Sequence, residues 1–157
     1  MEAVWRHLER LDAQIVSWLQ RNSVPLLRIA LGTVFLWFGA LKVVGASPVN
    51  DLVATTVYWF SPRWFVPLLG VWEMAIGVGL LFRVALRLTL LLLLVQLSGT
   101  FLTLVVAPDL AFRGSPLVLT DVGEFVIKNL VLLSAGLAIG GTVRGEGRIC
   151  PTGETPP

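Results

Sequence analysis

Apolar residues gather into four long runs, and shorter polar or proline-containing segments separate them. The runs lie at about 24–44, 64–82, 85–107 and 122–141. Each is close to the roughly 20 residues that an α-helix needs to cross the ~30 Å hydrocarbon core of a bilayer. Lipid offers no hydrogen-bond partner to a bare backbone, so helices are the expected structure for such runs. The pattern predicts an all-α integral membrane four-helix bundle over residues 23–143.

The segment before the first run, residues 1–22, has a different pattern. Acidic and basic residues interrupt it, and it lacks the continuous apolar core of a cleavable signal peptide. Its larger apolar residues recur every three or four positions, which is typical of an amphipathic helix. Such a helix would lie on the cytoplasmic membrane surface or pack on the inner end of the bundle, and the pattern allows both. The apolar stripe consists of Val4, Leu8, Leu11, Ile15 and Trp18.

The loop after the first run and the C-terminal tail complete the predicted organisation. The loop "SPVNDLVATTVYWF" offers Ser47 as a helix N-cap and Pro48 as the first helical residue. At about 12 residues it is too short to cross a bilayer, so we expect a short periplasmic interfacial helix. Ser61 and Pro62 start the second run in the same way. The polar tail, residues 144–157, is expected to be flexible and cytoplasmic.

Basic residues are distributed unequally between the two sides of the predicted bundle, and this predicts its orientation. The loops on one side contain only Arg63 and Arg113, beside three aspartates. Basic residues concentrate on the cytoplasmic side of membrane proteins. Both termini and the turn between the second and third runs are therefore expected in the cytoplasm. The other side carries Arg6, Arg10, Arg21, Arg28, Arg83, Arg87, Arg144 and Arg148.

Composition supports a membrane protein and excludes several functions. Hydrophobic residues make up 55% of the 157 positions, charged residues 14%, and mean hydropathy is +0.81. Soluble domains carry about 25% charge. The net charge is only +2, without a basic stripe that interleaves aromatics, so nucleic acid is not an expected partner. One cysteine, Cys150, and one histidine, His7, provide neither a thiol pair nor a cluster of metal ligands.

Seven polar residues inside the apolar runs are the candidate ligand-binding or ion-pair residues. With alternating helix directions, they fall at a similar depth, in the half of the bundle near the periplasm. Most share a helical stripe with glycine, and small residues line helix interfaces in membranes, so they are expected to point into the bundle. The glycines of "GLAIG", 136–140, are likewise expected to serve internal packing. The seven are Lys42, Glu73, Gln96, Thr100, Thr103, Lys128 and Asn129.

Glu73 is the most informative of these residues. A charge in the middle of a membrane helix costs several kcal/mol unless it is paired or protonated. Lys42 and Lys128 are its candidate partners. Three interpretations stay open: a buried ion pair that sets helix register, a site for a small anion or quinone headgroup, and a contact with a partner subunit. Lys42 alone would also fit a lysine that extends its ammonium to the interface.

Five segments together resemble the DoxX-like family of small bacterial membrane proteins, including its YkgB-like branch. The segments are "LRIALGTVFLWFGALK", "SPVNDLV", "LLGVWEMAIGVGLL", "LSGTFLTLVVAPDLAF" and "EFVIKNLVLLSAGL", in order over residues 24–143. The resemblance implies a multi-pass protein of the bacterial inner membrane. Some members are linked to oxidoreductase complexes, such as the quinone-reducing thiosulfate oxidoreductase, and others to oxidative-stress responses. The matching positions are Lys42, Glu73, Gly99, Thr100, Lys128 and Asn129.

The resemblance supplies no catalytic residue, and one position departs from the family pattern. Gly123-Glu124-Phe125 stands where the family is expected to have a glycine–glutamine–tyrosine-like sequence, which removes a phenol. The chain has no flavin motif, metal cluster or thiol pair, so it is not expected to be a complete enzyme on its own. We expect a non-catalytic or accessory subunit of a larger, redox-linked membrane complex. Its partners are the bilayer and a membrane protein or a second copy of the chain.

Two alternatives remain. The first is a quinone-interacting component of a membrane oxidoreductase, with quinone as the only candidate cofactor. The second is a small transporter or channel. It would have to be oligomeric, because four spans in one chain are few for alternating access.

Overall fold

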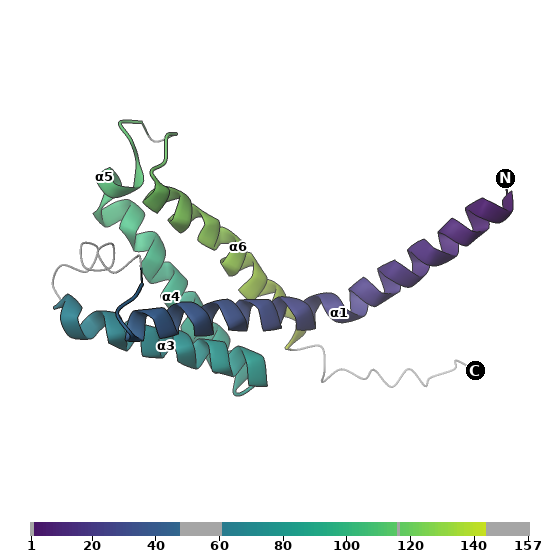
Figure 1. The fold of residues 1–157 in the computed structure, drawn as a ribbon, viewed down its shortest axis with the longest axis horizontal. Helices are drawn as coiled ribbons and strands as arrows, with labels where there is room; N and C mark the ends of the chain where they lie inside the picture. The colour runs from purple at the N-terminus through teal and green to yellow at the C-terminus, as the bar shows by residue number, and fades with distance from the viewer. Residues whose placement is uncertain (1, 48–60, 116, 144–157) are drawn as a thin grey trace, which may run out of the picture.

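The computed structural model describes residues 2–47, 61–115 and 117–143 of the chain. Its helices are α1 (Glu2–Val43), α3 (Pro62–Phe82), α4 (Leu86–Val106), α5 (Pro108–Ala111) and α6 (Asp121–Thr142). Figure 1 shows α1 lying along α3, with α4 and α6 beside this pair. The interfacial helix and the flexible tail expected from the sequence fall outside the described residues.

Four of these helices are long and apolar enough to cross a membrane. Three of the corresponding segments, Arg63–Phe82, Leu86–Val106 and Asp121–Thr142, match the predicted runs to within one residue at each end. The first segment, Leu8–Val43, is much longer than the predicted 24–44. The residues predicted to form an amphipathic N-terminal helix are continuous with the first span in α1.

Pro25 lies inside α1 without ending it. Proline lacks a backbone N–H and usually weakens the helical turn before it. Further toward the N-terminus, Asn22 Nδ2 donates to the Trp18 carbonyl at 2.8 Å, and Arg21 Nε donates to the Ser17 carbonyl at 3.2 Å. The helix nevertheless continues through the proline into the bilayer-length segment.

Local signals in the sequence set the ends of the other long helices. α3 begins at Pro62 after Ser61, as the Ser–Pro pair predicts. α3 ends at Arg83, which has the left-handed conformation (φ 57°), and its backbone N–H donates to the Gly79 carbonyl. α6 begins after Thr120, whose hydroxyl accepts a hydrogen bond from the Gly123 N–H at 3.1 Å. This cap satisfies one of the free N–H groups of the first turn.

All four long helices contribute to one hydrophobic core. Together, residues 24–43 of α1, α3, α4 and α6 are called the bundle below. Its outer end is where α1 and α4 finish and where α3 and α6 begin, and its inner end is the opposite one. The buried core residues are Leu31, Phe35, Ile76, Leu80, Leu90, Leu93, Leu97, Ala135 and Ile139.

The glycines of "GLAIG" pack inside the bundle, as predicted. A Cβ added at Gly136 would lie 2.9 Å from the Leu93 side chain, and one at Gly140 would lie 3.7 Å from the Leu90 side chain. These contacts fix the antiparallel register of α6 and α4. They place Asn129, two turns outward from Gly136, level with Thr100, two turns outward from Leu93.

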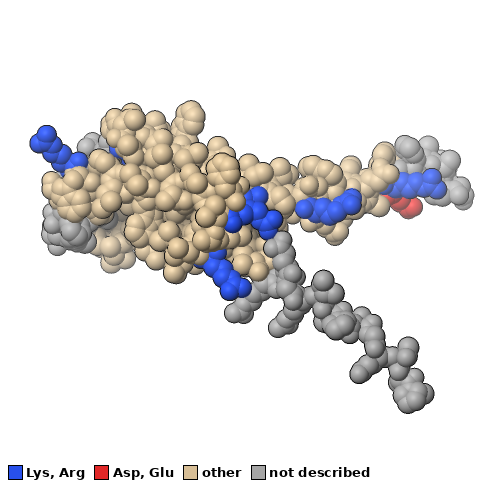
Figure 2. Space-filling view, turned by 90° about the horizontal axis from the view of Figure 1, so that it is seen from below, with Lys and Arg blue, Asp and Glu red and all other residues tan. Residues whose placement is uncertain are grey.

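The outside of the bundle is largely apolar. Large side chains such as Trp37, Val105 and Val131 are 66%, 77% and 70% exposed. Figure 2 shows Lys and Arg side chains at the two ends of the bundle and along the N-terminal part of α1. On the face drawn there, the middle of the bundle carries no charged side chains. This distribution is typical of a protein whose middle lies in hydrocarbon and whose ends meet water.

Candidate functional site: a buried polar cluster joining three helices

Glycines bring α1 and α3 unusually close together. A Cβ added at Gly39 would lie 2.6 Å from the Gly70 carbonyl oxygen, and one at Gly70 would lie 2.7 Å from the Gly39 carbonyl oxygen. Nearer the inner end, a Cβ added at Gly77 would lie 2.6 Å from the Leu36 backbone nitrogen and 2.8 Å from the Gly32 carbonyl oxygen. No side chain larger than a hydrogen fits at these crossings. Close backbone approach through small residues is a common way to pack membrane helices.

This approach brings the side chains of Lys42 and Glu73 together. Lys42 Nζ lies 2.6 Å from Glu73 Oε2, and the two residues are only 5% and 7% exposed. The Lys42 side chain leaves the last turn of α1, whereas Glu73 lies near the middle of α3. Helical side chains lean toward the N-terminus of their own helix. Because the two helices are antiparallel, the side chains lean toward each other.

Gln96 joins this ion pair to a third helix. Its Nε2 donates to Glu73 Oε1 at 2.7 Å, so each carboxylate oxygen of Glu73 has one donor. One turn outward on α4, the Thr100 hydroxyl donates to the Gln96 carbonyl at 3.2 Å. Lys42, Glu73 and Gln96, called the polar cluster below, link α1, α3 and α4. The charges of its lysine and glutamate cancel, and both carboxylate oxygens are hydrogen-bonded.

Lys128 does not join the polar cluster, contrary to one of the two pairings considered for Glu73. Its Nζ bonds Glu124 Oε2 at 2.9 Å on the surface of α6, and the two side chains are 74% and 54% exposed. Glu124 is one helical turn away on the same helix, so the pair forms without any contact between helices. Lys128 is adjacent to a buried position, Asn129, and a helix turns by about 100° per residue, which puts Lys128 on the outer surface.

The two remaining candidate residues are buried in the outer half of the bundle. Thr103 is 3% exposed and Asn129 is 7% exposed. The side-chain amide of Asn129 has no hydrogen-bond partner among residues 2–47, 61–115 and 117–143. A buried amide without a partner is costly, and most such groups bind something. Asn129 is therefore the one candidate whose hydrogen-bonding capacity the described residues leave unused.

Arg28 fastens α1 to α3 at the inner end. Its Nη1 donates to the carbonyl oxygens of Leu80 and Leu81, the latter at 3.0 Å. These carbonyls belong to the last turn of α3, where the carbonyl oxygens have no N–H partner within the helix. The sequence predicts that Arg28 is an anchor at the cytoplasmic end but does not indicate this backbone contact.

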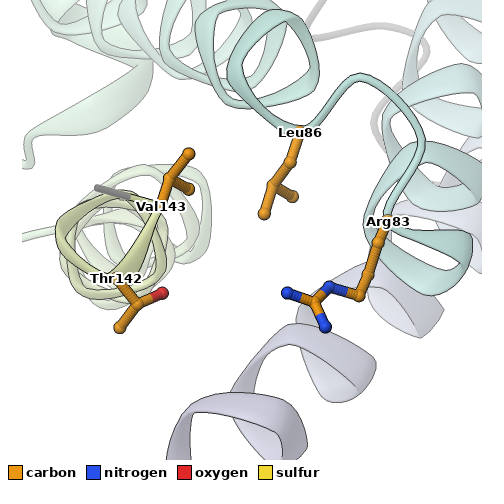
Figure 3. A pocket seen from close by; sticks show the side chains of 4 residues that line it. All are labelled: Arg83, Leu86, Thr142 and Val143. Atoms are coloured by element: carbon orange, nitrogen blue, oxygen red, sulfur yellow. The ribbon is translucent and has the colours of Figure 1, made fainter. Parts of the chain in front are cut away.

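A small pocket opens at the same inner end. Its volume is about 240 Å³, and Arg83, Leu86, Thr142 and Val143 line it. In Figure 3 the Arg83 guanidinium and the Thr142 side chain lie on either side of the opening, with Leu86 between them. Nothing in the sequence predicts the pocket, because it forms where the α3–α4 turn meets the end of α6. It is distant along each helix from the polar cluster.

No part of the chain that the structure describes brings three or more His, Cys, Asp or Glu side chains into a metal-binding group. Comparison of the chain with models of protein families, with curated proteins and with solved structures found no match.

Proposed function

We propose that this protein is a DoxX-like, non-catalytic subunit of a larger membrane complex in the bacterial inner membrane. Four helices of membrane length with an apolar outer surface support its multi-pass character. The distribution of arginines supports cytoplasmic termini, because Arg28 and Arg83 mark the inner end. The apolar surface of the bundle would then face lipid and the partner subunit.

One observation carries the non-catalytic part of the proposal: the polar cluster is satisfied within the chain. Glu73 binds Lys42 and Gln96 through separate oxygens, and both ends of the ion pair are buried. A site for an anionic substrate would need a positive charge in excess, and here the charges of Lys42 and Glu73 cancel. The cluster therefore holds three helices in register, which is what a scaffold needs.

The test is gentle solubilisation from the native membrane, followed by native mass spectrometry. We expect a membrane protein of defined stoichiometry to accompany the chain, without a stoichiometric small molecule. The variant with both Lys42→Met and Glu73→Gln should retain the partner if the bundle still folds, because the cluster does not contact it. A chain that is isolated alone, or as a homo-oligomer with one quinone per copy, would contradict the proposal.

A second candidate function, a quinone-interacting component, is favoured by the state of Asn129. Its amide is buried without a partner in the described chain and lies at the level of Thr100, one turn outward from Gln96. A quinone carbonyl would accept a hydrogen bond from this amide, and the surrounding apolar side chains would suit its ring. Lys42 and Glu73 would then support the helices around the ligand without contacting it.

Asn129→Leu separates the two candidates. If Asn129 binds nothing, the apolar replacement removes an unsatisfied amide and should raise the free energy of unfolding by about 1 kcal/mol. If Asn129 binds a quinone, the variant should fold normally and lose the quinone from its lipid extract. Ser134→Leu is a suitable control, because Ser134 is an exposed residue on the same helix whose hydroxyl bonds the Leu130 carbonyl.

A further inference from the structure

The N-terminal half of α1 extends well beyond the bundle. Arg28 binds the carbonyls at the end of α3, and Val24 is the first residue of α1 that packs on the core. Residues 2–23, called the arm below, are therefore outside the bundle, and at about 1.5 Å per residue they extend for roughly 33 Å. Figure 1 shows the arm leading away from the other helices.

The arm carries an apolar stripe that nothing in the described structure covers. Leu8, Leu11, Ile15 and Trp18 are 50%, 42%, 58% and 52% exposed. They follow each other at intervals of three and four residues, so they lie on one side of the helix. Trp5 is beside them and is 65% exposed. In the described structure, this stripe therefore does not contact the inner end of the bundle, one of the two placements that the sequence allows.

The stripe continues along the side of α1 that faces lipid. Positions three or four residues apart lie on the same side of a helix. Counted in this way from Trp18, the stripe side of α1 includes Asn22 and then exposed apolar residues of the bundle segment. The core-facing side of α1, with Leu31 and Phe35, instead continues into polar residues of the arm. The exposed apolar residues on the stripe side of the bundle segment include Leu26, Ile29 and Trp37.

We propose that the arm turns outward from the bundle and lies along the membrane surface at the inner end, with its apolar stripe in the interface. When a helix leaves the membrane and turns away from its bundle, its lipid-facing side becomes the side that faces the membrane. That side carries the stripe. Turning the other way, beneath the bundle, would place the polar side against the membrane. Pro25, which removes one backbone hydrogen bond, marks where the turn can occur.

The shape of the stripe favours a bilayer over a second copy of the chain. A two-stranded coiled coil has a narrow seam of alternating positions. Val16 and Leu19 are also exposed, at 41% and 47%, and together with Trp5 they extend the exposed apolar positions around Asp12 and beyond such a seam. Tryptophans near both ends of the arm, Trp5 and Trp18, are the residues that membrane interfaces prefer.

The charges on the arm predict that this contact is hydrophobic. Residues 2–23 contain three acidic and three basic side chains, so their net charge is zero. Arg10 and Arg21 lie off the apolar stripe. Anionic lipid would therefore add little attraction, and binding should depend on buried apolar area. The proposal rests on the membrane location of the bundle and does not depend on the subunit function.

The test uses the full chain in vesicles, with a spin label at a single cysteine in a Cys150→Ser background. Ile15→Cys places the label on the stripe, and Gln14→Cys places it one residue away, on the polar side of the arm. Val131→Cys places it on the outer surface of α6, where the side chain is 70% exposed. Collision rates with oxygen, which dissolves in lipid, and with a water-soluble nickel chelate are then measured for each label.

We expect the label at 15 to collide with oxygen several-fold more than with nickel, and the label at 14 to show the reverse. The result should be the same in phosphatidylcholine alone and with phosphatidylglycerol added. Free access of nickel to both arm labels would overturn the proposal, as would protection of label 15 from both reagents with spin–spin broadening, which would indicate a second copy. A lipid-like result at 131 shows that the bundle is in the bilayer whichever way the arm behaves.

Discussion

Removing one member of the Lys42–Glu73 pair is the strongest test of the polar cluster. Lys42→Met keeps the length of the side chain and removes its charge, which leaves Gln96 as the only partner of Glu73 among the described residues. Glu73→Gln keeps the shape of the carboxylate and leaves the ammonium of Lys42 without a counter-charge. The variant with both changes removes the two charges together.

The structure indicates how much each change should cost. The ion pair is short, at 2.6 Å, and both residues are more than nine-tenths buried. Leaving one charge of a buried pair without its partner costs about 3–5 kcal/mol, and a charge at the centre of a membrane helix costs about 2.5–3.5 kcal/mol on insertion scales. We therefore expect Lys42→Met to lower the free energy of unfolding by about 3 kcal/mol.

Glu73→Gln should cost less than Lys42→Met. Lys42 is in the last turn of α1, so its flexible side chain can turn its ammonium toward the outer interface. Glu73, near the middle of α3, has no such route. We expect a loss of about 1–2 kcal/mol for Glu73→Gln, and a double variant within about 1 kcal/mol of the original chain, because no charge is then left unpaired.

Reversible unfolding in mixed micelles of mild and denaturing detergent, followed by circular dichroism, measures these differences. The four proteins form a double-mutant cycle, and the coupling energy between the two positions should be at least about 3 kcal/mol. Coupling near zero, which means that the double variant loses as much stability as the two single variants together, would refute the idea that the pair locks α1 to α3.

Three further predictions use the same unfolding measurement. Gly39→Ala should lower stability by about 1–3 kcal/mol, because its Cβ would lie 2.6 Å from a carbonyl oxygen of α3. The control Gly99→Ala, whose Cβ would have no atom within 4 Å, should be neutral or slightly stabilising. Equal effects of the two changes would contradict the close packing of α1 and α3. Lys128→Met should cost less than Lys42→Met, because its pair with Glu124 lies within the first two turns of α6 and joins no second helix, and a loss as large as that of Lys42→Met would contradict this assignment. Arg28→Met should cost about 1–3 kcal/mol through two lost charged hydrogen bonds, and an unchanged transition would show that they contribute nothing.

The spans could be predicted from the sequence because their signal is local. A run of about 20 apolar residues is visible in the chain itself, and so are the Ser–Pro start of α3 and the glycines of α6. The extent of α1 could not be predicted in the same way. Pro25 and the change from an apolar to an amphipathic pattern suggest a break, but one proline can be accommodated in a helix whose flanking turns are stable.

The candidate site could be predicted only in part, because pairing depends on rotation and register between helices. Depth alone brings Lys42, Gln96 and Lys128 to about the level of Glu73. Only the crossing of α1 and α3 at their glycines decides that Lys42 reaches it. In the sequence, the four-residue spacing between Glu124 and Lys128 does indicate that they can pair on the surface of one helix. The backbone contacts of Arg28 leave no comparable signal.

The close contact between α1 and α3 also bears on how the chain enters the membrane. These two helices are synthesised before α4 and α6, and chains generally begin to fold from their N-terminal part. The glycine crossings and the Lys42–Glu73 bond need only these two helices. We expect the first hairpin to carry its lysine and glutamate into lipid as a neutral unit during synthesis. Gln96 would complete the cluster when α4 arrives.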